Sequence, residues 1–327
     1  MTTHASIVTL ASIERAIQQL SAIHVETQRD DQTRTAFNRL FFGEGAGFSP
    51  RFFAEGQETR GVAIVGAPGS GKTALVSHIL SEHPSLHFKG ELGVTKCLQV
   101  TVPSPATLKS VGLELLKALG YPQVSERRER WAIWEMVKHR LSVLGIKVLW
   151  IDEAHDIYNA GNVREKEDLL KTLKSLMQGP QAIVVVLCGT EPVAELLRSD
   201  HQVARRFSQV RLPPISFASD GDGLMNLIRS YAGRVELGVE IDPDLTQCLL
   251  HAARDQFGMA IEIAIGAIET ALRSRRPSLT RQDFIDYWFM QESCPLDENV
   301  FTTGNYSAWE DREVRANRAN SGKGRRQ

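Results

Sequence analysis

Residues 66–73 constrain the fold of this chain more than any other stretch. They are G-A-P-G-S-G-K-T and match the phosphate-binding loop pattern G-x-x-x-x-G-K-[ST] at every fixed position. The apolar residues 61–65 before the loop indicate a buried strand, and residues 74–80 after it indicate a helix. Glycines let successive backbone N–H groups point at phosphate oxygens, and the start of a helix adds its positive end. The stretch therefore predicts a nucleoside triphosphate site on an α/β fold, rather than a plain glycine-rich turn.

An acidic pair farther along the chain supplies the second half of the predicted site. Asp152 and Glu153 follow the apolar residues 146–151, which indicate another buried strand. We predict that Asp152 holds Mg²⁺ together with the Thr73 hydroxyl, and that Glu153 is the base that deprotonates the attacking water. A solvated acidic turn is the alternative, and the phosphate loop upstream disfavours it. The residues predicted to bind ATP are Gly66, Ala67, Pro68, Gly69, Ser70, Gly71, Lys72, Thr73 and Asp152.

Two further polar features are predicted to respond to the nucleotide. Thr190 follows the apolar strand expected at residues 182–188, where its hydroxyl would sense the γ-phosphate. Arg205 and Arg206 precede the last expected strand, residues 210–212. A guanidinium that is unpaired within its own domain suits an arginine finger, which reaches the nucleotide of a neighbouring subunit. A surface charge pair is the alternative for these two arginines.

The composition limits the classes of protein to which this chain can belong. The chain has 327 residues, enough for two domains, and a net charge of −1, so any nucleic-acid surface must be local. Its four cysteines are scattered without metal-ligand spacing, which is typical of free thiols in a reducing compartment. The sequence has no signal-peptide pattern and no apolar run long enough to cross a bilayer. We therefore expect a cytoplasmic protein without a membrane partner.

The order of patterns along the chain predicts four segments. Residues 1–60 form a helical extension that either covers the adenine or only packs on the domain. Residues 61–215 alternate strands with helices, which predicts a parallel sheet flanked by helices. Residues 216–291 indicate helices only, and so a small all-helical lid domain. We expect the polar residues 292–327 to be disordered, and residues 312–327 within them carry six Lys or Arg against one Glu.

The order of these parts resembles the AAA+ ATPases. A phosphate loop, an acidic strand end, a polar sensor, an arginine and a helical lid follow one another. A narrower resemblance is to the TniB and TnsC transposition regulators, and it covers about residues 60–290. It is carried by L-C-G-T-E-P at residues 187–192, by the D-x-Q-x-x-x-R-F pattern at residues 200–207, and by T-R-Q-D-F at residues 280–284.

This resemblance implies an activity and partners. Members of the family form ATP-dependent homo-oligomers, rings or helical filaments, on double-stranded DNA, and they link a target-selection protein to a transposase. By position, Arg206 matches the family's arginine finger, with Arg205 as the second choice. No arginine stands beside Gly258 in the lid, which departs from the AAA+ pattern, so we expect slow hydrolysis. The family's DNA contacts follow the second strand, where this chain offers Thr107, Lys109, Arg127 and Arg128.

Other classes of ATPase share these site residues. A replication initiator or clamp loader is the first alternative, and a secretion or signalling ATPase is the second. The sequence after residue 290 lacks the apolar periodicity of a winged-helix domain, which disfavours an initiator. The letters D-E-A-H at residues 152–155 also occur in helicases, but that class needs a second RecA-like domain, for which the expected lid and tail are too short. We therefore expect an ATP-dependent, DNA-binding AAA+ ATPase that regulates DNA transposition.

Overall fold

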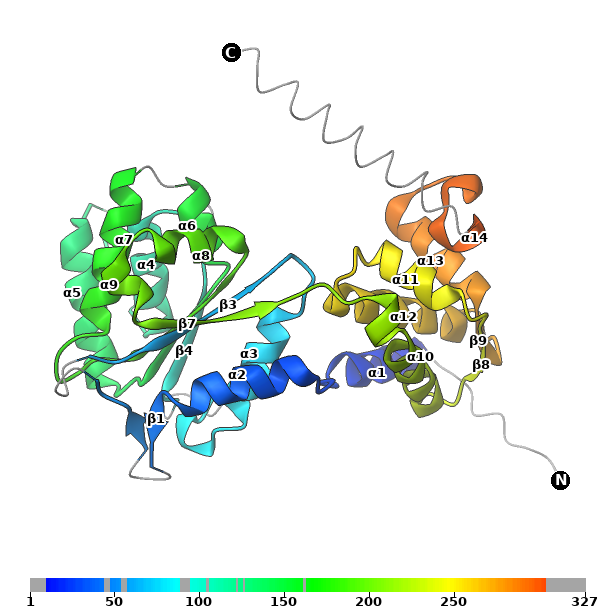
Figure 1. Cartoon of the computed structure of the whole chain (residues 1–327), viewed down its shortest axis with the longest axis horizontal. Coiled ribbons are helices and arrows are strands. Elements are labelled where there is room, and N and C mark those ends of the chain that lie inside the picture. The colour runs from blue at the N-terminus through cyan, green and yellow to red at the C-terminus, as the bar shows by residue number, and fades with distance from the viewer. Residues whose placement is uncertain are drawn as a thin grey trace, which may run out of the picture. The chain divides into compact units, whose positions relative to one another are not determined.

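The structure, a computed structural model, describes residues 10–43, 48–53, 58–88, 95–103, 106–121, 123–125, 127–160 and 163–303. The chain divides into two compact units, whose elements are labelled in Figure 1. The sheet unit comprises His24–Pro68 and Lys72–Pro213. The helical unit comprises Met1–Ile23, Gly69–Gly71 and Pro214–Gln327.

A parallel sheet of five strands forms the centre of the sheet unit. Its order is β4-β5-β6-β3-β7, and every neighbouring pair of strands is parallel. The three inner strands, β5, β6 and β3, are buried along almost their whole length, as expected for a sheet that is covered on both faces. The predicted parallel α/β fold is therefore confirmed. The strands are β3 (Gly61–Gly66), β4 (Cys97–Thr101), β5 (Val148–Asp152), β6 (Val184–Gly189) and β7 (Phe207–Leu212).

Helices cover both faces of this sheet, and a separate apolar core lies under each face (Figure 1). Successive side chains of a strand point to opposite faces. Accordingly, Ala63 and Val65 lie in the core shared with α4, α5 and α7, whereas Val62 and Ile64 lie in the core shared with α2 and α3. The helices are α2 (Gln28–Asn38), α3 (Lys72–Ser81), α4 (Leu108–Ala118), α5 (Arg130–Val143), α6 (His155–Ala160), α7 (Val163–Leu176), α8 (Glu191–Arg198) and α9 (His201–Ala204). Short elements complete the unit: β1 (Phe41–Phe42), which pairs antiparallel with β2 (Ser49–Pro50), and the 3₁₀ turn η2 (Pro84–Leu86).

The helical unit is built around α12 (Phe257–Arg273), which contacts α1, α10, α11 and α13. The unit also includes Gly69–Gly71, and the Gly69 carbonyl accepts a hydrogen bond of 2.9 Å from the Met259 amide of α12. Its other elements are α1 (Leu10–Ser21), α10 (Phe217–Arg234), β8 (Gly238–Glu240), α11 (Leu245–Ala252), β9 (Ser278–Thr280), α13 (Arg281–Glu292), η3 (Leu296–Glu298) and α14 (Val300–Thr303). The parallel pair of β8 and β9 was not predicted, because a strand of three residues has no periodicity to detect.

The expected N-terminal extension, residues 1–60, is divided between the two units. Its first helix, α1, packs on α12 of the helical unit, whereas α2 packs on α3 and β7 of the sheet unit. The amphipathic face of α1 buries Ile13 and Leu20, and α2 buries Phe37 in the sheet core. The two helices thus serve different cores although they are neighbours in sequence.

The expected disordered tail, residues 292–327, begins with ordered structure. Phe301 of α14 is fully buried, and its ring centroid lies 5.4 Å from that of Phe284 and 5.9 Å from that of Trp288. The buried Asn299 side chain donates a hydrogen bond of 3.0 Å to the Ile285 carbonyl. The sequence between Pro295 and Thr303 is too short to show a helical period, yet it packs on α13. Residues 304–327 lie outside the described part of the chain.

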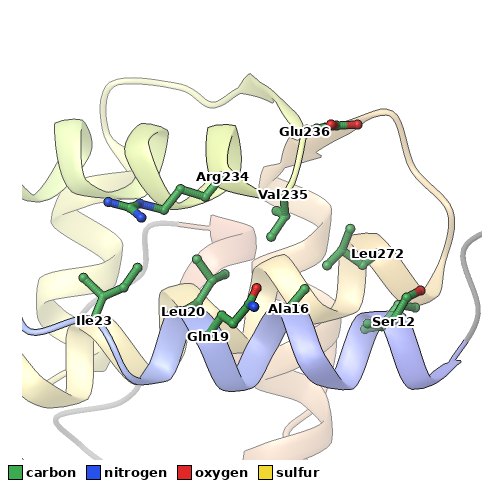
Figure 2. Close-up of a pocket in the computed structure, with 10 residues that line it drawn as sticks. Ser12, Ala16, Gln19, Leu20, Ile23, Arg234, Val235, Glu236 and Leu272 are labelled. Atoms are coloured by element: carbon green, nitrogen blue, oxygen red, sulfur yellow. The ribbon is translucent and has the colours of Figure 1, made fainter.

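A pocket of about 460 Å³ lies within the helical unit, between α1, the end of α10 and α12 (Figure 2). Ala16, Leu20 and Leu272 give it an apolar floor, and Arg234 lies along one side. The pocket contains none of the residues predicted to bind ATP. Over the described residues, no helix combines the length and the apolar character that crossing a membrane requires.

Candidate nucleotide-binding site

The phosphate loop connects β3 to α3, as the sequence predicts. Gly69 and Gly71 have φ angles of +74° and +90°, in the region that favours glycine, and these angles curl the backbone between strand and helix. Lys72 is 6% exposed, and its Nζ donates hydrogen bonds of 3.0 Å to the carbonyls of Gly66 and Ala67. The Ser70 hydroxyl is buried and has no hydrogen-bond partner among the described residues. The loop therefore holds the buried Lys72 ammonium and a Ser70 hydroxyl that can donate a hydrogen bond, where phosphate oxygens would bind.

Thr73 and Asp152 meet at the carboxyl ends of β3 and β5. The Thr73 hydroxyl donates a hydrogen bond of 2.8 Å to Asp152 Oδ2, and Asp152 is 4% exposed. A hydroxyl and a carboxylate side by side are hard oxygen ligands of the kind that Mg²⁺ prefers. The structure thus joins the two residues that the sequence assigns to the metal, although they are 79 positions apart.

Glu153 occupies a strained turn directly after β5. Its φ is +52°, an uncommon backbone conformation for a residue with a Cβ. Three hydrogen bonds fix the turn: the Glu153 amide donates to Asp152 Oδ1 at 3.0 Å, the Ala154 amide to the Cys188 carbonyl at 2.8 Å, and the Asp156 amide to the Glu153 carbonyl at 3.0 Å. The Glu153 carboxylate stays accessible, with 43% of the side chain exposed. Such strain, held by surrounding contacts, is typical of functional sites.

Thr190 follows β6 at the same edge of the sheet. The register pairs Val65 of β3 with Gly189 of β6, so that Thr190 lies beside the start of the phosphate loop. Thr190 is the N-cap residue of α8, but its side chain makes no capping hydrogen bond. This leaves its hydroxyl available to a ligand at the strand ends.

The strands behind the acidic pair are apolar and carry neutral groups. The Trp150 indole donates to the Cys188 sulfur at 3.2 Å, and both side chains are fully buried. Burial, reinforced by the nearby Asp152 charge, raises the pKa of the Cys188 thiol well above its ordinary value. All four cysteines are free and buried. A low-dielectric wall of this kind strengthens the interactions of charges at the site.

Arg205 and Arg206 have opposite environments. Arg206 is 2% exposed, and it donates to the Gln202 carbonyl and to the Glu58 carboxylate. Arg205 is 61% exposed, and its Nη2 lies 3.0 Å from the same Glu58. The expectation of a guanidinium unpaired within its own domain therefore describes neither arginine, because both contact Glu58. Sequence reasoning missed Glu58, because a single Glu outside any periodic element gives no signal.

The four residues predicted to contact DNA lie on and before α4 and α5, which pack on each other. Thr107 is the N-cap of α4, and its hydroxyl accepts a hydrogen bond of 3.0 Å from the Ser110 amide. Lys109 is half-buried in the first turn of α4, and Arg127 and Arg128 are exposed just before α5. None of the three cations forms an ion pair with a described residue. Thr107 thus has a structural task that the sequence analysis did not assign.

The five-stranded sheet, the phosphate loop, the acidic strand end and the helical unit together define an AAA+ ATPase. A family model described as "Bacterial TniB protein" matches residues 53–217, half of the chain, and the chain belongs to this family. This confirms the predicted resemblance. A search of curated proteins found no match.

Solved structures share the fold at low sequence identity. The Aeropyrum pernix ORC1 protein in complex with DNA is 17% identical with a TM-score of 0.59, covering 86% of this chain and 69% of that one. Cdc6p from Pyrobaculum aerophilum is 13% identical with a TM-score of 0.58, covering 87% and 75%. Drosophila ORC bound to DNA is 15% identical with a TM-score of 0.52, covering 91% and 71%.

Proposed function

We propose that this TniB-family protein is a Mg²⁺-dependent ATPase that assembles on double-stranded DNA and regulates transposition. The observation that carries the proposal is the meeting of Thr73, Asp152 and Glu153 beside the phosphate loop, in a chain of this family. ATP favours assembly and hydrolysis favours release. The TniB resemblance adds the expected partners, a transposase and a target-selection protein.

Each residue of the site has a distinct task in this proposal. Lys72 and the loop amides bind the β- and γ-phosphates, and the spare Ser70 hydroxyl adds a donor. Thr73 and Asp152 hold Mg²⁺, which would neutralise charge on the phosphates. Glu153 takes the proton of the attacking water, and Thr190 donates to the γ-phosphate. Since no lid arginine stands beside Gly258, we expect turnover to be slow.

The environment of the two arginines bears on how subunits would cooperate. An arginine finger must extend from one subunit to the nucleotide of the next. Arg205 is 61% exposed and Arg206 only 2%. We therefore assign the finger to Arg205 and give Arg206 a supporting role, which reverses the order of preference that the family pattern implies.

A DNA replication initiator is the second candidate, and the likeness to ORC and Cdc6 structures favours it. Two of those structures are described as bound to DNA. An initiator that reads base edges would prefer particular sequences, whereas a transposition regulator that contacts only phosphates would bind most sequences equally. Competition between unrelated DNA duplexes for the ATP-bound protein separates the two.

The site assignment is tested with Glu153→Gln and Lys72→Ala. Glu153→Gln should bind a fluorescent ATP analogue like the wild type but lose about 100-fold or more in turnover, because an amide cannot accept the proton. Lys72→Ala should lose binding itself, since the phosphates lose a buried cation. Lys171→Ala, an exposed lysine on α7, is the matched control. Phosphate release at the wild-type rate by Glu153→Gln would defeat the assignment.

A further inference from the structure

His155, at the start of α6, stands close to the proposed base. Its imidazole is 18% exposed, and its Nδ1 lies 3.2 Å from Glu153 Oε2. The other ring nitrogen, Nε2, lies 3.6 Å from Asp156 Oδ1, which is too far for a hydrogen bond. Nδ1 is buried and has no well-aligned hydrogen bond to any residue in the described part of the chain. A buried polar atom without a partner needs an explanation, and here the Glu153 carboxylate is an acceptor only 3.2 Å away.

The position of His155 depends on the absence of a side chain at Gly189. A Cβ built at Gly189 would come within 3.1 Å of the His155 backbone nitrogen, 3.2 Å of its Nδ1 and 2.6 Å of Val193 Cγ2. The end of β6 therefore approaches His155 more closely than a larger residue allows. Because Thr190 follows Gly189 directly, the same approach brings the imidazole near the strand end that carries the proposed γ-phosphate sensor.

We propose that His155 is a positioning residue for Glu153. The inference rests on the proposed role of Glu153 as the base. A carboxylate only accepts hydrogen bonds, so Nδ1 carries the proton that makes the contact attractive. The glutamate side chain has three rotatable bonds and is 43% exposed, and this contact restricts its orientation. Catalytic hydrogen bonds are often long or poorly aligned before the substrate binds and tighten in its complex, which fits a 3.2 Å contact of this geometry.

The test compares two replacements of His155. In His155→Asn the side-chain amide nitrogen lies close to the position of Nδ1, whereas His155→Ala removes the donor. His155→Ala should lower kcat by about 10- to 100-fold and leave KM and nucleotide affinity within about twofold, because only the geometry of the base changes. His155→Asn should keep kcat within about threefold of the wild type. His139→Ala, at an exposed histidine of α5, is the control and should change nothing.

The outcomes separate this inference from the function on which it rests. Wild-type kcat in His155→Ala, or equal losses in the Asn and Ala variants, would overturn the positioning role while leaving Glu153 as the base. A loss of nucleotide affinity that matches the loss of kcat would also overturn it. Normal turnover in Glu153→Gln would instead defeat the proposed function.

If His155→Ala does not fold, ¹⁵N NMR of the imidazole decides the question in the protein with His155 intact. The Nδ1 resonance, assigned by its absence in His155→Asn, should shift when Glu153 becomes Gln. An unchanged resonance would contradict the contact.

Discussion

At the scale of single residues, the neighbouring arginines Arg205 and Arg206 lie in different environments. Arg206 is buried and donates to Gln202 and Glu58, whereas Arg205, one position earlier, is mostly exposed and contacts the same Glu58. Removing one partner of a buried ion pair leaves an uncompensated charge, whereas an exposed pair contributes little. The two arginines should therefore differ most in their effect on stability.

Arg206→Ala should lower the free energy of unfolding by about 2 kcal/mol, because a buried, charge-assisted hydrogen bond to Glu58 is lost, although Glu58 keeps its contact with Arg205. Arg205→Ala should cost less than about 1 kcal/mol, but it should slow ATP turnover in the assembled oligomer. Urea denaturation measures the first effect and phosphate release the second. Equal losses of stability would show that burial does not distinguish these residues.

At the scale of elements, an ion pair connects α2 to Glu82, the residue that directly follows α3. The Arg34 guanidinium binds both oxygens of Glu82, through Nε at 2.8 Å and Nη2 at 2.7 Å. This hydrogen bonding by Arg34, which outweighs the opposing effect of burial, holds the pKa of Glu82 below its ordinary value of 4.5. Other charged groups close to the pair are Glu26, Asp31, His78 and His83.

A lowered pKa fixes the sign of a pH effect. The ionised form of Glu82 stabilises the folded protein above about pH 4.5, and this contribution disappears as the pH falls towards the lower pKa of the folded state. Between about pH 5 and pH 3 the wild type should lose up to about 1 kcal/mol more than Glu82→Gln does. Urea denaturation across this range measures the difference, with Glu135→Gln, at an exposed pair on α5, as the control. Parallel pH profiles for wild type and Glu82→Gln would contradict the prediction.

At the scale of the whole molecule, DNA binding has two possible sources in this chain. The first source is the three cations Lys109, Arg127 and Arg128, which form no ion pairs with described residues. The second is residues 312–327, which carry a charge of +5 in the sequence (six Lys or Arg minus one Glu). Three cations on one subunit bind weakly, so the first source requires several aligned subunits and therefore ATP. The second source acts without nucleotide.

A chain that ends at Thr303 separates these sources, because it keeps the packed Phe301 that a cut at Pro295 would remove. It should still bind DNA in an ATP-dependent and steeply salt-dependent manner, whatever the sequence. Arg127→Ala and Arg128→Ala should each lower the salt slope by about one. Gel shifts with and without ATP measure this. Absence of ATP-dependent binding by the shortened chain would point to residues 304–327 instead.

The phosphate loop, the acidic pair and the parallel sheet could all be predicted from the sequence. Gly66 to Thr73 form a local motif whose strand and helix adjoin it, and the strands are apolar runs bounded by turns. Even the meeting of Thr73 with Asp152 could be predicted, because parallel strands bring their carboxyl ends to one edge. These features depend only on short-range patterns of apolar and polar residues and on the parallel direction of the strands.

The side chains that the site residues contact could not be predicted in this way, because they depend on long-range packing. Glu58 reaches Arg206 across 148 positions, and the close approach of Gly189 to His155 joins two strand ends. Likewise α1 and α2 enter different cores, and Phe301, in a segment that the sequence analysis expects to be disordered, packs on Phe284 of α13. Burial and ion pairing are properties of long-range packing, and a single residue outside a periodic element carries no local signal of them.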